Sequence, residues 1–181
     1  FVDQVDRYLK EWRHNDSDES ATYVIDADCP RFGSGEAKAL IHQSMRGRDV
    51  YIISDCFNYG VTYNMRGVQI PMSPDDHFQD LKRVIAAIEG KARRISVIMP
   101  MLYEGRQHKR SARESLDCAL ALQELVNMGV ANIITFDAHD PRVQNAIPLN
   151  GFDNVHPTYQ MIKALVHEYP DLSLSHDQIT L

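Results

Sequence analysis

Cysteine is scarce in this chain, with only Cys29, Cys56 and Cys118 among 181 residues. These positions are too few and too widely spaced to form a disulfide framework or a zinc-binding motif. Each is expected to be a small buried apolar side chain, and reduced thiols favour a cytoplasmic location.

Long apolar runs and excess positive charge are also missing. No stretch approaches the ~20 apolar residues that a membrane-spanning helix needs, which argues against a membrane protein. The net charge of −6 argues against wrapping of nucleic acid by bulk electrostatics. A hydrophobic fraction of 44% over 181 residues is enough for the core of one large domain. We therefore expect a globular domain with neither a membrane nor a nucleic acid as partner.

Strand and helix patterns alternate along the chain. Short apolar runs are typical of buried parallel strands, and apolar residues at helical spacing or cap residues indicate helices. The expected strands are 22–26, 50–53, 95–99 and 132–136, with a weaker one at 37–41 and a hairpin around 59–65. The expected helices are 1–12, 73–90, 111–128 and 157–167, the third opened by a capping box of Ser111 and Glu114. This order predicts an α/β fold, a mainly parallel sheet flanked by helices on both faces.

A basic loop follows the second expected buried strand. It carries Arg106, Lys109, Arg110 and Arg113 in an otherwise acidic protein, and it runs into an expected helix N-terminus. Guanidinium groups and helix N-termini both favour phosphate oxygens. The loop is therefore a candidate phosphate site, and a merely solvated basic loop is the alternative.

A second candidate site is Asp137-Ala138-His139-Asp140, directly after the third buried strand. Imidazole and carboxylate together can hold a divalent cation directly or through its waters. The alternative is that these side chains only satisfy cap and turn hydrogen bonds. Both candidate loops fall where ligands bind in parallel sheets, beyond the carboxyl ends of the strands.

Two further loops precede the first buried strand. In residues 31–36, the aromatic Phe32 beside glycines could stack on a base and Glu36 could accept from an amine, although an ordinary turn is the alternative. Residues 44–48 form a smaller basic turn.

Together, these segments resemble the ribose-phosphate pyrophosphokinases, also called phosphoribosyl pyrophosphate synthetases. The resemblance lies in residues 31–36, 44–53, 103–110 and 132–139, in the family's order. It covers only the N-terminal half of a family member and implies a phosphoribosyltransferase-like domain at 21–170 after a helix and linker at 1–20. Residues 171–181 would then begin a linker or a second domain that is missing here.

The resemblance implies Mg²⁺-dependent transfer of the diphosphate of ATP to ribose 5-phosphate. Arg106 and Gln107 match the family's ATP-binding pair, and His139 matches its metal-binding histidine, with Asp137 in the same motif. Phe32 and Glu36 match a loop that a neighbouring subunit lays over the adenine, which implies a dimer or hexamer. Ser44 and Arg46 match positions of a regulatory phosphate site in part of the family.

Departures from the family pattern keep an alternative open. Ser34, His108 and Ser111 replace residues usual in the family. A non-catalytic regulatory homologue that associates with the true enzyme would tolerate such changes, and an unrelated phosphate-binding module is a third reading. The family's ribose 5-phosphate loop and catalytic lysine loop do not occur before Leu181, so no catalytic residue is assigned. This chain alone is therefore expected to bind magnesium nucleotide weakly without turnover.

Overall fold

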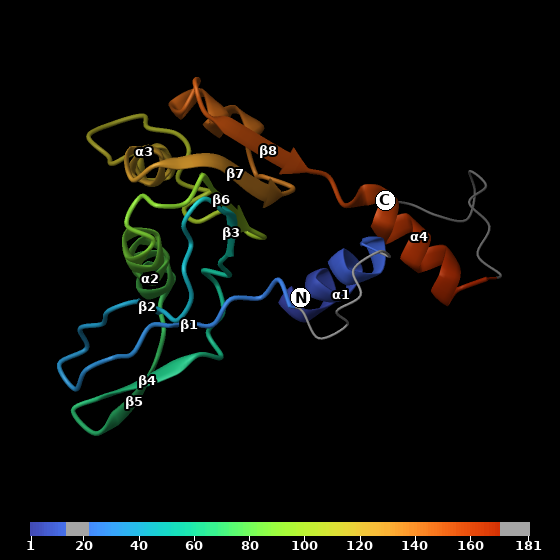
Figure 1. The fold of residues 1–181 in the computed structure, drawn as a ribbon. Coiled ribbons are helices and arrows are strands. Elements are labelled where there is room, and N and C mark those ends of the chain that lie inside the picture. Colours follow the sequence, from blue (N-terminus) through green and yellow to red (C-terminus); the bar gives the residue numbers. More distant parts are fainter. Residues whose placement is uncertain (14–21, 171–181) are drawn as a thin grey trace.

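A four-stranded sheet organises the chain in the computed structural model, which describes residues 1–13 and 22–170. Its strands are β3 (Asp49–Ile53), β6 (Arg94–Met99), β7 (Val130–Phe136) and β8 (Gly151–Val155). They stand in the order β3-β6-β7-β8, and every pairing is parallel (Figure 1). The three apolar runs are confirmed as strands. The edge strand β8 was not predicted, because polar residues interrupt its apolar ones.

Two helices cover one face of this sheet. Helices α2 (Pro74–Ala87) and α3 (Asp117–Asn127) lie on the same side of the strands (Figure 1). Leu81 of α2 and Leu125 of α3 belong to the same buried cluster as Val97 and Ile133 of the sheet. The predicted α/β fold with a parallel sheet and flanking helices is therefore confirmed.

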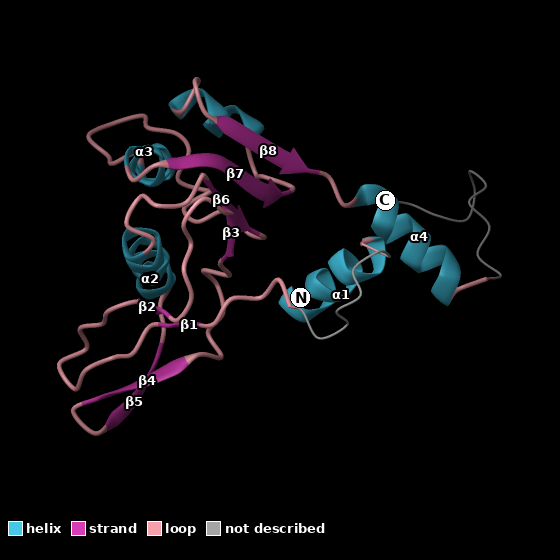
Figure 2. Ribbon diagram, viewed as in Figure 1, coloured by secondary structure: helices cyan, strands magenta, loops and turns pink. Residues whose placement is uncertain are grey.

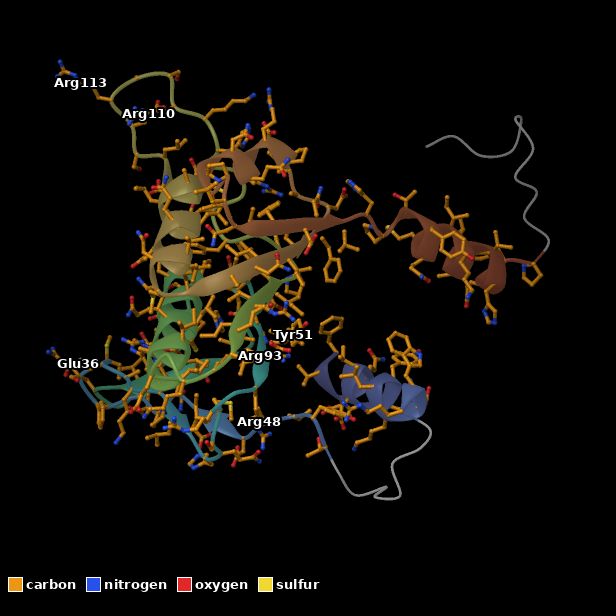
Figure 3. All side chains as sticks on the ribbon, turned by 45° about the horizontal axis from the view of Figure 1, so that its top comes forward. Glu36, Arg48, Tyr51, Arg93, Arg110 and Arg113 are labelled. Atoms are coloured by element: carbon orange, nitrogen blue, oxygen red, sulfur yellow. The ribbon has the colours of Figure 1, made fainter. Side chains whose placement is uncertain are left out.

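The opposite face is covered less completely. Helices α1 (Val2–Trp12) and α4 (Thr158–Glu168) form as expected but bury none of their side chains. The ring of Phe1 meets that of Phe136 edge to face at 6.5 Å, while Tyr51 remains 56% exposed (Figure 3). The expected cover by helices is thus complete on one face only.

Two small antiparallel hairpins stand apart from the main sheet. One pairs β1 (Ala27–Asp28) with β2 (Leu40–Ile41), and the other pairs β4 (Thr62–Met65) with β5 (Val68–Pro71). The predicted strand at 22–26 is wrong, because the backbone N–H of Tyr23 donates to Oδ1 of Asp6 in α1 at 2.7 Å and joins no sheet. The predicted strand at 37–41 is reduced to its last two residues.

The start of α3 also differs from the expectation. The N–H of Ser111 does donate to Oε2 of Glu114 at 3.2 Å, but the helix begins only at Asp117. A helix opening at Ser111 would place Arg113 in its first turn, against the positive end of the helix dipole, whereas Asp117 suits that end. The result is the long loop between β6 and α3 that Figure 2 draws in pink.

Other local expectations have mixed outcomes. Ser73 and Asp76 form the capping box that opens α2, but the helix ends at Ala87, short of residue 90. A 3₁₀ helix over Pro141–Ala146 was not predicted.

The three cysteines differ in burial. Cys56 and Cys118 are fully buried, and Cys29 is half-buried. No helix within residues 1–13 and 22–170 combines the length and the apolar character needed to cross a bilayer. The expected linker at 15–20 and the tail at 171–181 lie outside the described residues.

Candidate functional site

The carboxyl ends of β6 and β7 frame an open pocket of about 380 Å³. The loop after β6 contributes Met101, Leu102 and Arg106, and β7 and the loop after it contribute Phe136, Asp137, Ala138 and His139. Three of the predicted site residues, Arg106, Asp137 and His139, therefore line one cavity. Two polar loops meet there because parallel strands end at the same edge of their sheet.

A tight turn brings Arg106 to the pocket. Glu104 takes a left-handed backbone conformation with a φ of 54°, and the N–H of Gly105 donates to the carbonyl of Leu102 at 3.0 Å. A Cβ atom added at Gly105 would lie only 3.0 Å from that same carbonyl oxygen, so this turn favours glycine.

Gln107 anchors this loop with its backbone. Its N–H donates to the carbonyl of Glu104 at 2.8 Å, and its own carbonyl accepts from the N–H of Cys118 in α3 at 3.3 Å. Gln107 is not among the pocket-lining residues, so the structure brings only one member of the predicted ATP-binding pair into the cavity. Arg110 and Arg113 extend from the outer part of the loop (Figure 3).

Backbone hydrogen bonds fix the loop after β7. Asp137 has a φ of 48°, and its N–H donates to the carbonyl of Val155 in β8 at 3.0 Å. The next N–H, from Ala138, donates to Oδ1 of Asn154 at 2.8 Å. His156 follows β8 and lies with Nδ1 3.5 Å from Oδ1 of Asp137. Sequence reasoning gave His156 no partner, and recognising β8 as a strand would have placed it at this edge.

His108, on the loop after β6, contacts two residues of the loop after β7. Its ring packs edge to face against His139 at 5.1 Å, and its Nε2 lies 3.4 Å from Oδ2 of Asp140. Arg142 donates to both carboxylate oxygens of Asp140 at 2.6 to 3.1 Å, which holds the pKa of that carboxyl well below its ordinary value. The His108 side chain is only 10% exposed, and its Nδ1 is buried without a hydrogen-bond partner among the described residues.

The remaining predicted site residues lie elsewhere. Phe32 and Glu36 are exposed on the loop between β1 and β2, at the opposite end of the domain from the carboxyl ends of β6 and β7 (Figures 1 and 3). Ser44 and Arg46 are exposed on the turn before β3, and neither lines the pocket.

A separate group of possible metal ligands lies on the β1–β2 hairpin. The ligand atoms of Asp26, Asp28 and His42 lie within 4.8 Å of one another, and all three residues are exposed. Nε2 of His42 lies 3.0 Å from Oδ2 of Asp28, and this contact raises the pKa of the imidazole. Sequence reasoning missed the pair because only the antiparallel register brings these residues together.

Comparison with known proteins identifies relatives. Residues 7–129 match the family model for the N-terminal domain of ribose phosphate pyrophosphokinase. The ribose-phosphate pyrophosphokinase of Bacillus caldolyticus is 28% identical over 116 residues, which cover 63% of this chain and 32% of that protein. The Mycobacterium leprae enzyme of the same name is 24% identical over 153 residues, 84% of this chain and 42% of that protein.

A solved structure has the same fold. Phosphoribosylpyrophosphate synthetase from Mycobacterium smegmatis matches with a TM-score of 0.72 at 21% identity, over 93% of this chain and 49% of that one. The chain thus spans between about a third and half of the length of the relatives it matches.

Proposed function

Since the chain belongs to the ribose-phosphate pyrophosphokinase family, we propose that it is the nucleotide-binding N-terminal half of a ribose-phosphate diphosphokinase. In the reaction, the anomeric hydroxyl of ribose 5-phosphate attacks the β-phosphorus of ATP. The bond from that phosphorus to the oxygen bridging to the α-phosphorus breaks, and AMP leaves as phosphoribosyl pyrophosphate forms. The observation that carries the proposal is that Arg106 and His139, from two separate loops, line one pocket at the carboxyl edge of the sheet.

The residues of the pocket suit a triphosphate. Diphosphoryl transfer depends on alignment and charge neutralisation more than on covalent chemistry. Arg106 offers a planar fork of donors to phosphate oxygens. Its turn and the loop at Asp137 are both held by backbone hydrogen bonds, so the backbone that carries these residues is in place before the nucleotide arrives.

The donor set of the loop after β7 fits a divalent cation. His139 and Asp137 present an imidazole and a carboxylate to an open pocket, which leaves room for a Mg²⁺ ion that keeps several waters. When bound, Mg²⁺ would neutralise charge on the phosphate oxygens and align them. His108 packs against His139 and keeps its ring at the pocket edge.

A second copy of the chain is part of this proposal. Phe32 and Glu36 are not among the pocket-lining residues, and the loop between β1 and β2 that carries them lies at the other end of the domain from the carboxyl ends of β6 and β7 (Figure 1). They would therefore serve the pocket of a neighbouring subunit in a dimer or hexamer. Ser44 and Arg46 are proposed as a regulatory phosphate site, supported by their exposure on a basic turn. The three free cysteines support a cytoplasmic location.

The test is an assay of the full-length protein with ATP, ribose 5-phosphate and Mg²⁺, followed by ³¹P NMR. We expect equal amounts of AMP and phosphoribosyl pyrophosphate, no product without Mg²⁺, and no turnover by the 181-residue chain alone. ATP binding without product in the full-length protein would overturn the enzymatic proposal and favour the regulatory homologue. The intact mass of the native gene product, measured first, identifies the protein to assay.

A further inference from the structure

The β4–β5 hairpin has no evident role in the core. Its strands pair only with each other within the described chain, from Thr62 with Pro71 to Met65 with Val68. None of its residues belongs to the buried core cluster. It lies beside the β1–β2 hairpin, at the end of the domain away from the pocket (Figure 1). Because the hairpin adds nothing to the buried core, its contacts with neighbouring segments indicate its role.

Three contacts join β4 and the following turn to residues 31–36. The guanidinium carbon of Arg31 lies 4.7 Å from the centre of the Tyr63 ring. The N–H of Arg66 donates to the carbonyl of Gly33 at 3.2 Å. A Cβ atom added at Gly35 would lie 3.0 Å from Sδ of Met65, so the loop and the hairpin are in close contact.

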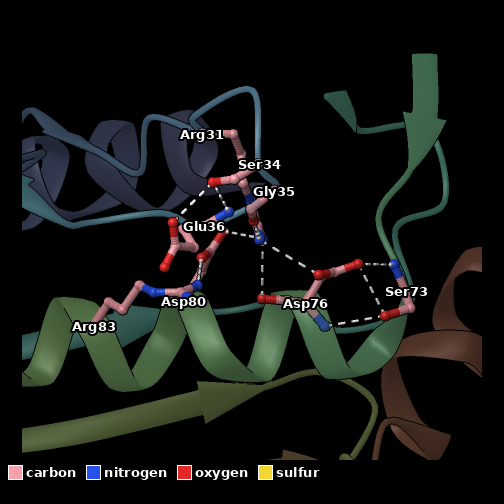
Figure 4. A network of polar contacts seen from close by, with 8 residues as sticks. All are labelled: Arg31, Ser34, Gly35, Glu36, Ser73, Asp76, Asp80 and Arg83. Atoms are coloured by element: carbon pink, nitrogen blue, oxygen red, sulfur yellow. Dashed lines mark hydrogen bonds and ion pairs between the residues drawn. The ribbon is translucent and has the colours of Figure 1, made fainter. Parts of the chain in front are cut away.

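Helix α2 holds Arg31 through carboxylates. The guanidinium of Arg31 lies 3.4 Å from Oδ1 of Asp76 and 3.0 Å from Oδ2 of Asp80. It also donates to the carbonyl of Gly35 at 3.3 Å (Figure 4). The side chain is only 9% exposed. Arg31 is thus clamped between the ring of Tyr63 and two carboxylates, and because it is buried from water its cation–π attraction is stronger than at an exposed site.

The tip of the loop is tightly turned, and the side chains of Phe32 and Glu36 stay exposed on it. The N–H of Phe32 donates to the carbonyl of Glu36 at 2.7 Å, and the N–H of Gly35 donates to the carbonyl of Phe32 at 2.8 Å. Gly35 has a φ of 93°, which favours glycine. The Phe32 ring is 50% exposed, and the Glu36 carboxylate faces outward, held by Ser34 Oγ at 2.8 Å (Figures 3 and 4).

We infer that the β4–β5 hairpin is a positioning element for the loop at residues 31–36. By holding Arg31 against α2, Tyr63 keeps Phe32 and Glu36 in the orientation in which they meet the base of a nucleotide on a neighbouring subunit. Tyr63 acts through Arg31 and is a positioning residue. The inference rests on the proposed function, because it needs a base for the loop to meet.

The test compares Tyr63→Leu with Tyr63→Phe in the full-length protein. Leucine removes the aromatic face, whereas phenylalanine keeps it and loses only the hydroxyl. We expect Tyr63→Leu to raise KM for ATP about 2- to 30-fold, the range that a cation–π contact supports, with kcat and KM for ribose 5-phosphate unchanged. Tyr63→Phe should stay within about twofold of the wild type. Val68→Ala is the control for a change elsewhere in the same hairpin, because Val68 of β5 is 61% exposed. This variant should keep the KM for ATP of the wild type.

Hydrogen exchange gives a readout that does not depend on activity. In Tyr63→Leu, the amides of Phe32 and Gly35 should exchange faster than in the wild type, and in Tyr63→Phe and Val68→Ala they should not. Unchanged exchange in Tyr63→Leu overturns the inference even if the enzyme is active. Faster exchange with an unchanged KM for ATP, or an equal rise of both KM values, overturns it as well. A wild-type protein that forms no phosphoribosyl pyrophosphate overturns the proposed function, whereas the exchange data still report on the clamp.

Discussion

The imidazole rings of His108 and His139 lie edge to face, with their centroids 5.1 Å apart. The first ring belongs to the loop after β6 and the second to the loop after β7, so this contact joins the two loops that line the pocket. Sequence reasoning treated His108 only as a departure from the family pattern. In the folded chain, it supports the side chain proposed to bind the metal.

Replacing His139 tests the metal site directly. The His139→Ala variant of the full-length protein should bind Mn²⁺, used as a spectroscopic substitute for Mg²⁺, at least tenfold more weakly, because loss of even an indirect partner of a metal site costs 10- to 100-fold. Binding is measured by electron paramagnetic resonance in the presence of ATP. His167→Ala, an exposed histidine in α4, is the matched control. Equal Mn²⁺ affinity in both variants would remove His139 from the site.

Arg106 should differ from the other arginines of its loop. A hydrogen bond to a charged group contributes about 1.5–3 kcal/mol, so Arg106→Ala should raise KM for ATP about 10- to 150-fold. Arg113→Ala should have little effect, because Arg113 extends away from the pocket (Figure 3). Steady-state kinetics of both variants decide this point. Similar increases of KM for ATP in the two variants would mean that the loop binds ATP only through its total positive charge.

Gly105 is expected to be needed for stability as well as for the site. In Gly105→Ala, the new methyl group would lie 3.0 Å from the carbonyl oxygen of Leu102, and relieving that contact should cost about 1–3 kcal/mol. Urea unfolding measures the loss. Gly33→Ala is the control, because nothing lies within 4 Å of its added Cβ. Equal free energies of unfolding in the two variants would contradict the close contact between residue 105 and the carbonyl of Leu102.

The carboxyl of Asp140 should make the free energy of unfolding depend on pH in the acid range. Arg142 lowers the pKa of Asp140 in the folded chain, so the carboxylate stabilises the fold above its unfolded pKa of about 3.9 and this stabilisation is lost as the pH falls below it. The wild type should therefore be more stable than Asp140→Asn at pH 6, and the difference should shrink on acidification below about pH 4. Urea unfolding across this range measures both. A difference that does not change with pH would refute the assignment.

The elements that sequence reasoning found are those whose pattern is local. β6 and β7 are apolar runs because the central strands of a parallel sheet are largely buried, and β3 at the edge has the same local pattern although its Tyr51 is exposed. β8 was missed, since an edge strand carries polar residues such as Asp153 and Asn154. The start of α3 was misplaced because the residues of a capping box were present, while the cations beside them oppose a helix at that point.

The sequence by itself determined the family, the alternation of strands and helices, and the placement of Arg106, Asp137 and His139 after buried strands. These features follow from residue types and spacing over short stretches. Only the tertiary structure decided that the backbone of Gln107 bonds to Glu104 and Cys118. It also decided that His108 lies against His139 and that Arg31 lies between Tyr63 and Asp80. Arg31 and Asp80 are 49 positions apart, and such contacts depend on how the hairpins and helices pack, which no local pattern encodes.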